Sequence, residues 1–260
     1  VSGKGGVGKS TVAANLALAL ADGGAKVGLM DADIYGPSVP IMFGVRGERP
    51  MMKKVEGSDR GMIVPLDRFG IKLMSIGLLI DEKNAVVWRG PMASSAIRQF
   101  VTDVDWGDLD YLVIDMPPGT GDIHLTLLQI VPVTGVVVVT TPQDVAKKGI
   151  AMFGQAQVNV PIIGLVENMS YFTPAELPDN KYFIFGKEGG KRLAEEFDLP
   201  FLGQIPLVQG IREGGDIGVP VMIGDDIVSR NAFLEFASGA VRSISMLNAN
   251  ISADKVSELV

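Results

Sequence analysis

Short apolar runs alternate along the chain with longer segments that carry helical periodicity. Runs that are apolar at nearly every position are typical of strands buried on both faces of a parallel sheet. They lie at residues 26–31, 71–77, 110–115, 136–142, 162–168 and 201–206. This alternation predicts an α/β fold, with a doubly wound, mostly parallel sheet that carries helices on both faces.

The segments between these runs predict the helices. Residues 12–21 contain almost only Ala, Leu and Val, and we expect a buried helix there. A second helix is expected over residues 94–104, after a turn that contains Pro91, and a third from Gln143. Residues 44–68 are rich in Gly, Pro and charge and show little periodicity, which predicts a mobile excursion.

The C-terminal part predicts one more helix. Residues 227–247 have apolar side chains at helical spacing, and we expect this helix to pack on the sheet. Residues 248–260 are expected to form a flexible tail. The predicted organisation is therefore one domain over residues 1–247.

The opening stretch carries the clearest chemical signal. Residues 3–11 read G-K-G-G-V-G-K-S-T and fit the pattern G-x-x-x-x-G-K-[ST], which is a phosphate-binding loop followed by a helix. Glycines allow the backbone to turn its N–H groups toward phosphate oxygens, and the positive end of the helix attracts the same anion. The expected nucleotide contacts are Gly3, Lys4, Gly5, Gly6, Val7, Gly8, Lys9, Ser10 and Thr11.

Two side chains of this loop have expected roles in catalysis. Lys9 is expected to reach the β- and γ-phosphates, and the Ser10 hydroxyl is expected to hold Mg²⁺. Lys4 is an additional lysine just after the first glycine, and it brings more positive charge than nucleotide binding requires.

Acidic residues follow two of the predicted strands. Ligands of open α/β sheets lie at the carboxyl ends of the strands, where Asp31 and Asp115 are placed. We expect Asp115 to hold Mg²⁺ through water, Asp31 to support the ion from an outer shell, and Asp33 to orient the attacking water.

Two later strand ends are candidates for contact with the nucleotide base. The amide of Asn168 could read the adenine edge, and Pro206 could flank the base. His124, the single histidine, is predicted to lie early in a helix and is left out of the site.

Composition narrows the possible partners. The net charge is −7 without a basic block, which argues against nucleic acid. The chain has no cysteine, so a disulfide framework and a cysteine nucleophile are excluded. No apolar run approaches the ~18 residues of a membrane span. We expect a cytoplasmic protein that has no membrane partner.

The first residues raise a separate expectation. A phosphate-binding loop normally follows a buried parallel strand, yet only Val1 and Ser2 precede Gly3. We therefore expect the sequence to be part of a longer protein, with that strand upstream of Val1.

Several motifs together resemble one family. The chain is similar to the Mrp/ApbC ATPases, which are iron–sulfur cluster carriers of the MinD/ParA superclass with a deviant Walker A loop. The resemblance covers nearly the whole chain through these stretches: G-K-G-G-V-G-K-S-T, D-A-D-I-Y-G-P-S, W-R-G-P-M, D-Y-L-V-I-D-M-P-P-G-T-G-D, T-T-P-Q, E-N-M-S-Y-F and I-F-G.

This resemblance implies a homodimeric enzyme that hydrolyses ATP slowly with Mg²⁺ and binds or transfers iron–sulfur clusters to apoproteins or assembly proteins. It also implies that the early lysine, Lys4, crosses the dimer interface to the partner's nucleotide and takes part in catalysis there, beside Lys9 and Asp33. The family's nucleotide roles would fall on Lys4, Lys9, Ser10, Asp33, Asp115 and Asn168.

One departure from the family pattern concerns the cluster. Family members usually carry a Cys-x-x-Cys pair soon after E-N-M-S-Y-F, whereas residues 173–180 here contain no cysteine. Glu176 and Asp179 are hard ligands and poor substitutes for thiolate. Direct cluster binding by this chain is therefore not expected from these residues.

Two alternative functions stay open at the level of sequence. One is a cysteine-free switch of the MinD/ParA type, whose ATP-bound dimer acts on a protein partner. The other is a small-molecule kinase or ligase on the same fold, for which the sequence shows no substrate pocket.

Overall fold

The computed structural model describes residues 1–257 apart from short gaps. These gaps are residues 3, 35, 55–60, 80–89, 120–121, 144–145, 154–159, 175 and 178–179. Trp88 and Arg89 of the W-R-G-P-M motif lie outside the described residues.

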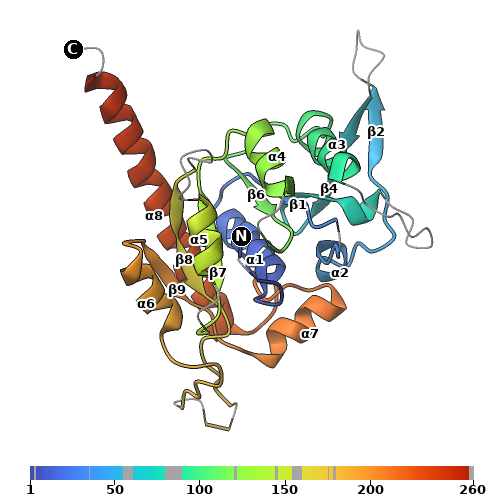
Figure 1. Cartoon of the computed structure of the whole chain (residues 1–260). Coiled ribbons are helices and arrows are strands. Elements are labelled where there is room, and N and C mark those ends of the chain that lie inside the picture. Colours follow the sequence, from blue (N-terminus) through green and yellow to red (C-terminus); the bar gives the residue numbers. More distant parts are fainter. Residues whose placement is uncertain are drawn as a thin grey trace.

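Helices and strands alternate along most of the described chain (Figure 1). The strands are β1 Val27–Asp31, β2 Met51–Lys54, β3 Gly61–Val64, β4 Leu66–Arg68, β5 Ile71–Ser75, β6 Tyr111–Asp115, β7 Val136–Thr140, β8 Ile162–Glu167 and β9 Phe201–Gln204. The helices are α1 Lys9–Asp22, α2 Val39–Met42, α3 Gly90–Thr102, α4 Asp122–Ile130, α5 Lys147–Phe153, α6 Gly189–Glu196, α7 Gln209–Ile217 and α8 Ile227–Ser257, with a 3₁₀ turn at Ile76–Leu78.

The described strands form two main sheets and a separate hairpin. One sheet has the order β4-β5-β1-β6, in which β5, β1 and β6 are parallel and β4 is an antiparallel edge strand. The other has the order β7-β8-β9 and is parallel throughout. The mostly parallel α/β fold predicted from the sequence is confirmed, although the strands do not form one continuous sheet.

The two main sheets approach each other across a hollow of about 640 Å³. It is lined by the strands β6 and β7, and by one side of α1. Val1 lies against β7: its amino group donates to the Val137 carbonyl at 2.8 Å, and the Val139 N–H donates to the Val1 carbonyl at 2.8 Å. The phosphate-binding loop therefore starts in the space between the two sheets.

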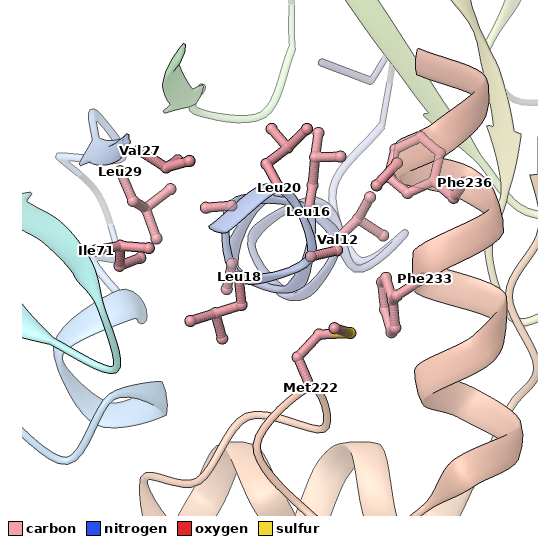
Figure 2. Close-up of a cluster of buried hydrophobic side chains, with 14 of the residues drawn as sticks. Val12, Leu16, Leu18, Leu20, Val27, Leu29, Ile71, Met222, Phe233 and Phe236 are labelled. Carbon is pink, nitrogen blue, oxygen red and sulfur yellow. The ribbon is translucent and has the colours of Figure 1, made fainter. Parts of the chain in front are cut away.

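Helix α1 lies at the centre of the largest hydrophobic core. Leu29 and Ile71 lie on one side of it, and Phe233 and Phe236 of α8 lie on the other (Figure 2). Its burial on several sides matches a sequence that is apolar around the whole helix. Because α1 begins at Lys9, this packing fixes the end of the phosphate-binding loop.

The predicted excursion over residues 44–68 is only partly irregular. The hairpin of β2 and β3 lies within it, and β4 pairs with β5. Every residue of β2 is exposed. Because no face of this strand is buried, its sequence does not alternate between apolar and polar side chains, and that pattern could not predict a strand here.

Several helix boundaries differ from the sequence prediction. Helix α1 begins at Lys9, three residues before the expected start, and α3 spans Gly90–Thr102 instead of residues 94–104. The helix expected from Gln143 begins at Lys147, after a turn at Pro142–Gln143. Helix α8 continues to Ser257, ten residues beyond the expected end at Leu247, and extends past the sheet (Figure 1). Within the described residues, no helix is both long enough and apolar enough to cross a membrane.

Candidate functional site

The phosphate-binding loop has the backbone geometry that its glycines predict. Gly6 and Gly8 both have φ of +81°, in the left-handed region that favours glycine. Helix α1 starts directly after Gly8, and no side chain caps its N-terminus. The first N–H groups of the helix are therefore available to an anion, which the helix dipole also attracts.

The side chains of the loop differ in exposure. Lys9 is 8% exposed, Lys4 is exposed, and Ser10 and Thr11 are half-buried. The Ser2 hydroxyl donates to the Lys4 carbonyl at 2.6 Å, which ties down the start of the loop. Gly3 was also predicted to contact nucleotide, but it lies outside the described residues.

Two buried carboxylates lie side by side at the carboxyl ends of β1 and β6. Asp31 and Asp115 are partners in the register of these parallel strands, as the sequence predicted for acids at one sheet edge. Burial raises the pKa of Asp115, while a hydrogen bond from Ser10 and the charge of Lys9 oppose that shift. Among the described residues, Oδ2 of Asp115 has no hydrogen-bond partner.

Asp31 makes more hydrogen bonds than Asp115. It is fully buried, and it accepts from the Ser75 hydroxyl at 2.9 Å and from the Asp33 N–H at 3.1 Å. Burial and the nearby charge of Asp115 raise the pKa of Asp31 to about 8. Asp33 itself is half-buried and follows two residues after β1.

Asn168 lies directly after β8 and contacts the phosphate-binding loop. Its side-chain Nδ2 donates to the Val7 carbonyl at 2.9 Å, and the residue is 6% exposed. A Cβ added to Gly8 would collide with the same amide group. The structure thus places Asn168 at the site, with its amide directed to the loop backbone.

A small hollow beside the loop identifies residues that the site prediction did not include. Its lining outside the loop comprises Thr141, Gln143, Met169 and Phe185. Thr141 and Gln143 belong to T-T-P-Q and Phe185 to I-F-G, so the family motifs held the signal, but no strand pattern distinguished these positions. Among the described residues, Pro206 is buried after β9 and does not line this hollow.

In the described part of the segment where family members carry cysteines, the structure shows no metal-binding group. Glu176 is exposed, and Asp179 lies outside the described residues. Across the described part of the chain, no three or more His, Cys, Asp or Glu residues gather in a way that could hold a metal ion.

Comparison with known proteins identifies the family of this chain. The model of the ParA family, described as NUBPL iron-transfer P-loop NTPase, matches residues 1–240. The chain belongs to this family. It is therefore related to the iron-transfer P-loop NTPases that this model describes.

Individual relatives agree with this family. The iron-sulfur cluster carrier protein of Synechocystis is 51% identical over 251 residues, which cover 94% of this chain and 70% of the relative. A nucleotide-binding protein of Archaeoglobus fulgidus, solved in complex with ADP, is 38% identical with a TM-score of 0.73 and 87% coverage of both chains. The septum site-determining protein MinD of Pyrococcus horikoshii, 23% identical over 91% of this chain and 92% of its own, shares the fold with a TM-score of 0.63.

Proposed function

We propose that this chain binds and slowly hydrolyses MgATP, and that it acts in the transfer of iron–sulfur clusters to apoproteins. The observation that carries the proposal is the uncapped start of α1 beside the buried Lys9, which together form a site for the phosphates of a nucleotide. Family membership and the relative solved with ADP support the choice of a nucleotide.

The residues present fit a magnesium ion bound with the nucleotide. The free Oδ2 of Asp115 and the nearby hydroxyl of Ser10 offer the oxygen ligands that Mg²⁺ prefers. Asp31 supports this pair from its outer side. When bound, Mg²⁺ supplies positive charge against the phosphate oxygens.

Lys9 neutralises charge that develops on the transferred phosphoryl group, and Asp33 orients the attacking water. The oxygen of that water bonds to the γ-phosphorus as the bond from this phosphorus to the ADP oxygen breaks. ADP and inorganic phosphate are released, and the protons of the water pass to the phosphate and to solvent. The sequence predicts Asn168 and Pro206 on the adenine side, and Asn168 donates a hydrogen bond to the loop.

Lys4 acts on a second copy of the chain. Its side chain is exposed at the rim of the loop, which leaves it accessible to a partner in a homodimer. The proposed dimer therefore completes each active site with the partner subunit's lysine.

The iron–sulfur cluster is cargo in this proposal. The chain has no cysteine, and thiolates are the usual ligands of such clusters. We infer that the chain supplies the ATP-driven step, while thiolates come from outside these 260 residues.

The same absence of cysteine favours a second function, an ATP-dependent dimer switch of the MinD type that acts on a protein partner. The two functions differ in one measurable property. Only the first requires MgATP to change the rate at which a cluster passes from a loaded donor to an apoprotein.

The proposed activity is tested by ATP turnover and binding of the purified chain. We expect steady release of phosphate that depends on Mg²⁺, and loss of ATP affinity by about tenfold to a hundredfold in Lys9→Ala, since a hydrogen bond between charged groups contributes about 1.5–3 kcal/mol. Lys191→Ala, which removes an exposed lysine of α6, is the matched control. Equal ATP binding by Lys9→Ala and the wild type would contradict the proposal.

A further inference from the structure

The side chain of Asn168 contacts the backbone of the phosphate-binding loop, 161 residues away in the sequence. Its Nδ2 donates to the Val7 carbonyl at 2.9 Å, and both groups are buried. This bond uses one of the two N–H groups of the amide. The oxygen Oδ1 and the second N–H are the groups with which the same amide could read a base.

A hydrogen bond to this carbonyl fixes the neighbouring N–H as well. The Val7 carbonyl and the Gly8 N–H belong to one planar trans peptide group, in which they point in opposite directions. Because Asn168 holds the carbonyl on its own side, the Gly8 N–H points away from Asn168. Gly8 itself has φ of +81°, in the left-handed region that favours glycine.

Asn168 itself is held rigidly. Its backbone N–H donates to the Thr140 carbonyl at 2.8 Å. The preceding residue, Glu167, is fully buried and accepts from the Gly190 N–H at 2.5 Å and from Gln204 Nε2 at 2.8 Å. A side chain mounted on such a junction keeps its direction when solvent or ligand enters.

The residue that follows shows that this junction is under strain. Met169 has φ of +55°, which a side chain other than glycine rarely adopts. Strained backbone persists where the surrounding contacts hold it, often next to a functional site. Here it turns the chain directly after Asn168 and places Met169 in the lining of the hollow beside the loop.

We propose that Asn168 is a positioning residue for phosphate binding, because its amide orients the Val7–Gly8 peptide group so that the Gly8 N–H faces the phosphates. This inference rests on the proposed nucleotide function. It adds to the role predicted from the sequence, in which the amide reads adenine. Only the positioning role predicts that a change at Asn168 weakens the binding of ligands that lack a base.

Calorimetric titration with ATP, GTP and inorganic tripolyphosphate separates them. We expect Asn168→Ala to bind all three ligands about tenfold more weakly than the wild type does, by the same factor for each. The exposed Asn231→Ala in α8 is the matched control and should leave all three affinities unchanged. Loss of affinity for ATP alone, or no loss for any ligand, would overturn the inference.

A second measurement begins with the wild type and so does not depend on the stability of a variant. In ¹⁵N-labelled wild-type protein, tripolyphosphate should shift the amide resonance of Gly8. The Asn168→Asp variant, which replaces the amide donor with an acceptor of similar shape, should lose that shift. An unchanged Gly8 resonance in the wild type at saturating tripolyphosphate would overturn the inference. Failure of the wild type to bind either ATP or tripolyphosphate would instead defeat the proposed function, and the inference with it.

Discussion

At the scale of single residues, the neighbouring buried carboxylates Asp31 and Asp115 have different surroundings: Asp31 is fully buried with two hydrogen bonds, while Asp115 keeps a free oxygen. The sequence predicts a helix after the phosphate-binding loop, because that motif is local, although the helix begins within the motif at Lys9. The sequence could not show the difference between the two carboxylates. That difference depends on Ser75, which lies 44 residues from Asp31 and reaches it only through the pairing of β5 with β1.

The buried Asp31 predicts how stability depends on pH. Its pKa is about 8 in the folded protein and about 3.8 when unfolded, so between these values only the folded state holds the proton. The contribution of Asp31 to the free energy of unfolding therefore falls as pH rises through this window, by at most about 1.4 kcal/mol per pH unit. Asp31→Asn, which mimics the protonated group, should lose this dependence.

Urea unfolding between pH 5 and pH 8, with EDTA present, measures the effect. The difference in free energy of unfolding, Asp31→Asn minus wild type, should increase as pH rises. The exposed Asp67→Asn in β4 serves as the control and should follow the wild-type profile. Parallel profiles for Asp31→Asn and the wild type would show that Asp31 does not hold a proton in the folded state.

At the scale of elements, buried strands were predictable and exposed ones were not. Apolar runs in the sequence predicted β1, β6, β7 and β8, because parallel strands that are covered on both faces contain few polar side chains. The exposed β2 has no such signal. The start of α5 was misplaced because Pro142 and Gln143 form a turn that local preference cannot distinguish from a helix start.

The contact between α6 and this turn gives a prediction about two glycines. A Cβ on Gly189 would fall on the Pro142 carbonyl oxygen, whereas a Cβ on Gly210 in α7 would meet only atoms at ordinary contact distance. We expect Gly189→Ala to lower the free energy of unfolding by about 1–3 kcal/mol through overpacking. Gly210→Ala should raise it by up to about 1 kcal/mol, because alanine restricts the unfolded chain.

Denaturant unfolding of both variants tests this difference at one pH and temperature. The two variants are directly comparable, because each adds one methyl group to a glycine near the start of a helix. Similar stability changes in the two variants would mean that α6 does not pack against the turn at Pro142 as described.

At the scale of the whole molecule, the family assignment and the chemistry of the chain differ on one point. The chain belongs to the iron-transfer P-loop NTPases, yet its 260 residues include no cysteine. The sequence alone revealed both facts, because motifs and composition need no structure. The arrangement of two sheets around α1 could not be deduced, since it depends on packing between elements that are far apart in the sequence, such as α1 and α8 (Figure 2).

The proposed dimer predicts a specific defect and its rescue. Lys4→Ala should lower ATP turnover by at least about tenfold with a smaller effect on ATP binding, because a lysine from the partner stabilises charge only during phosphoryl transfer. An equimolar mixture with Lys9→Ala should recover activity, since mixed dimers pair an intact Lys4 with an intact Lys9. Absence of recovery, or equal loss of binding and turnover in Lys4→Ala, would place Lys4 in its own active site.

The most direct test of the proposed function measures bound nucleotide and bound iron in one sample. The chain would be reconstituted anaerobically with iron, sulfide and MgATP, then desalted, and nucleotide, iron and sulfide would be counted per chain. We expect close to one nucleotide per chain and no stoichiometric iron, because the loop is intact and thiolates are absent. A chain without nucleotide, or one that holds stoichiometric iron and sulfide, would contradict the assignment of an ATP-driven module that lacks cluster ligands of its own.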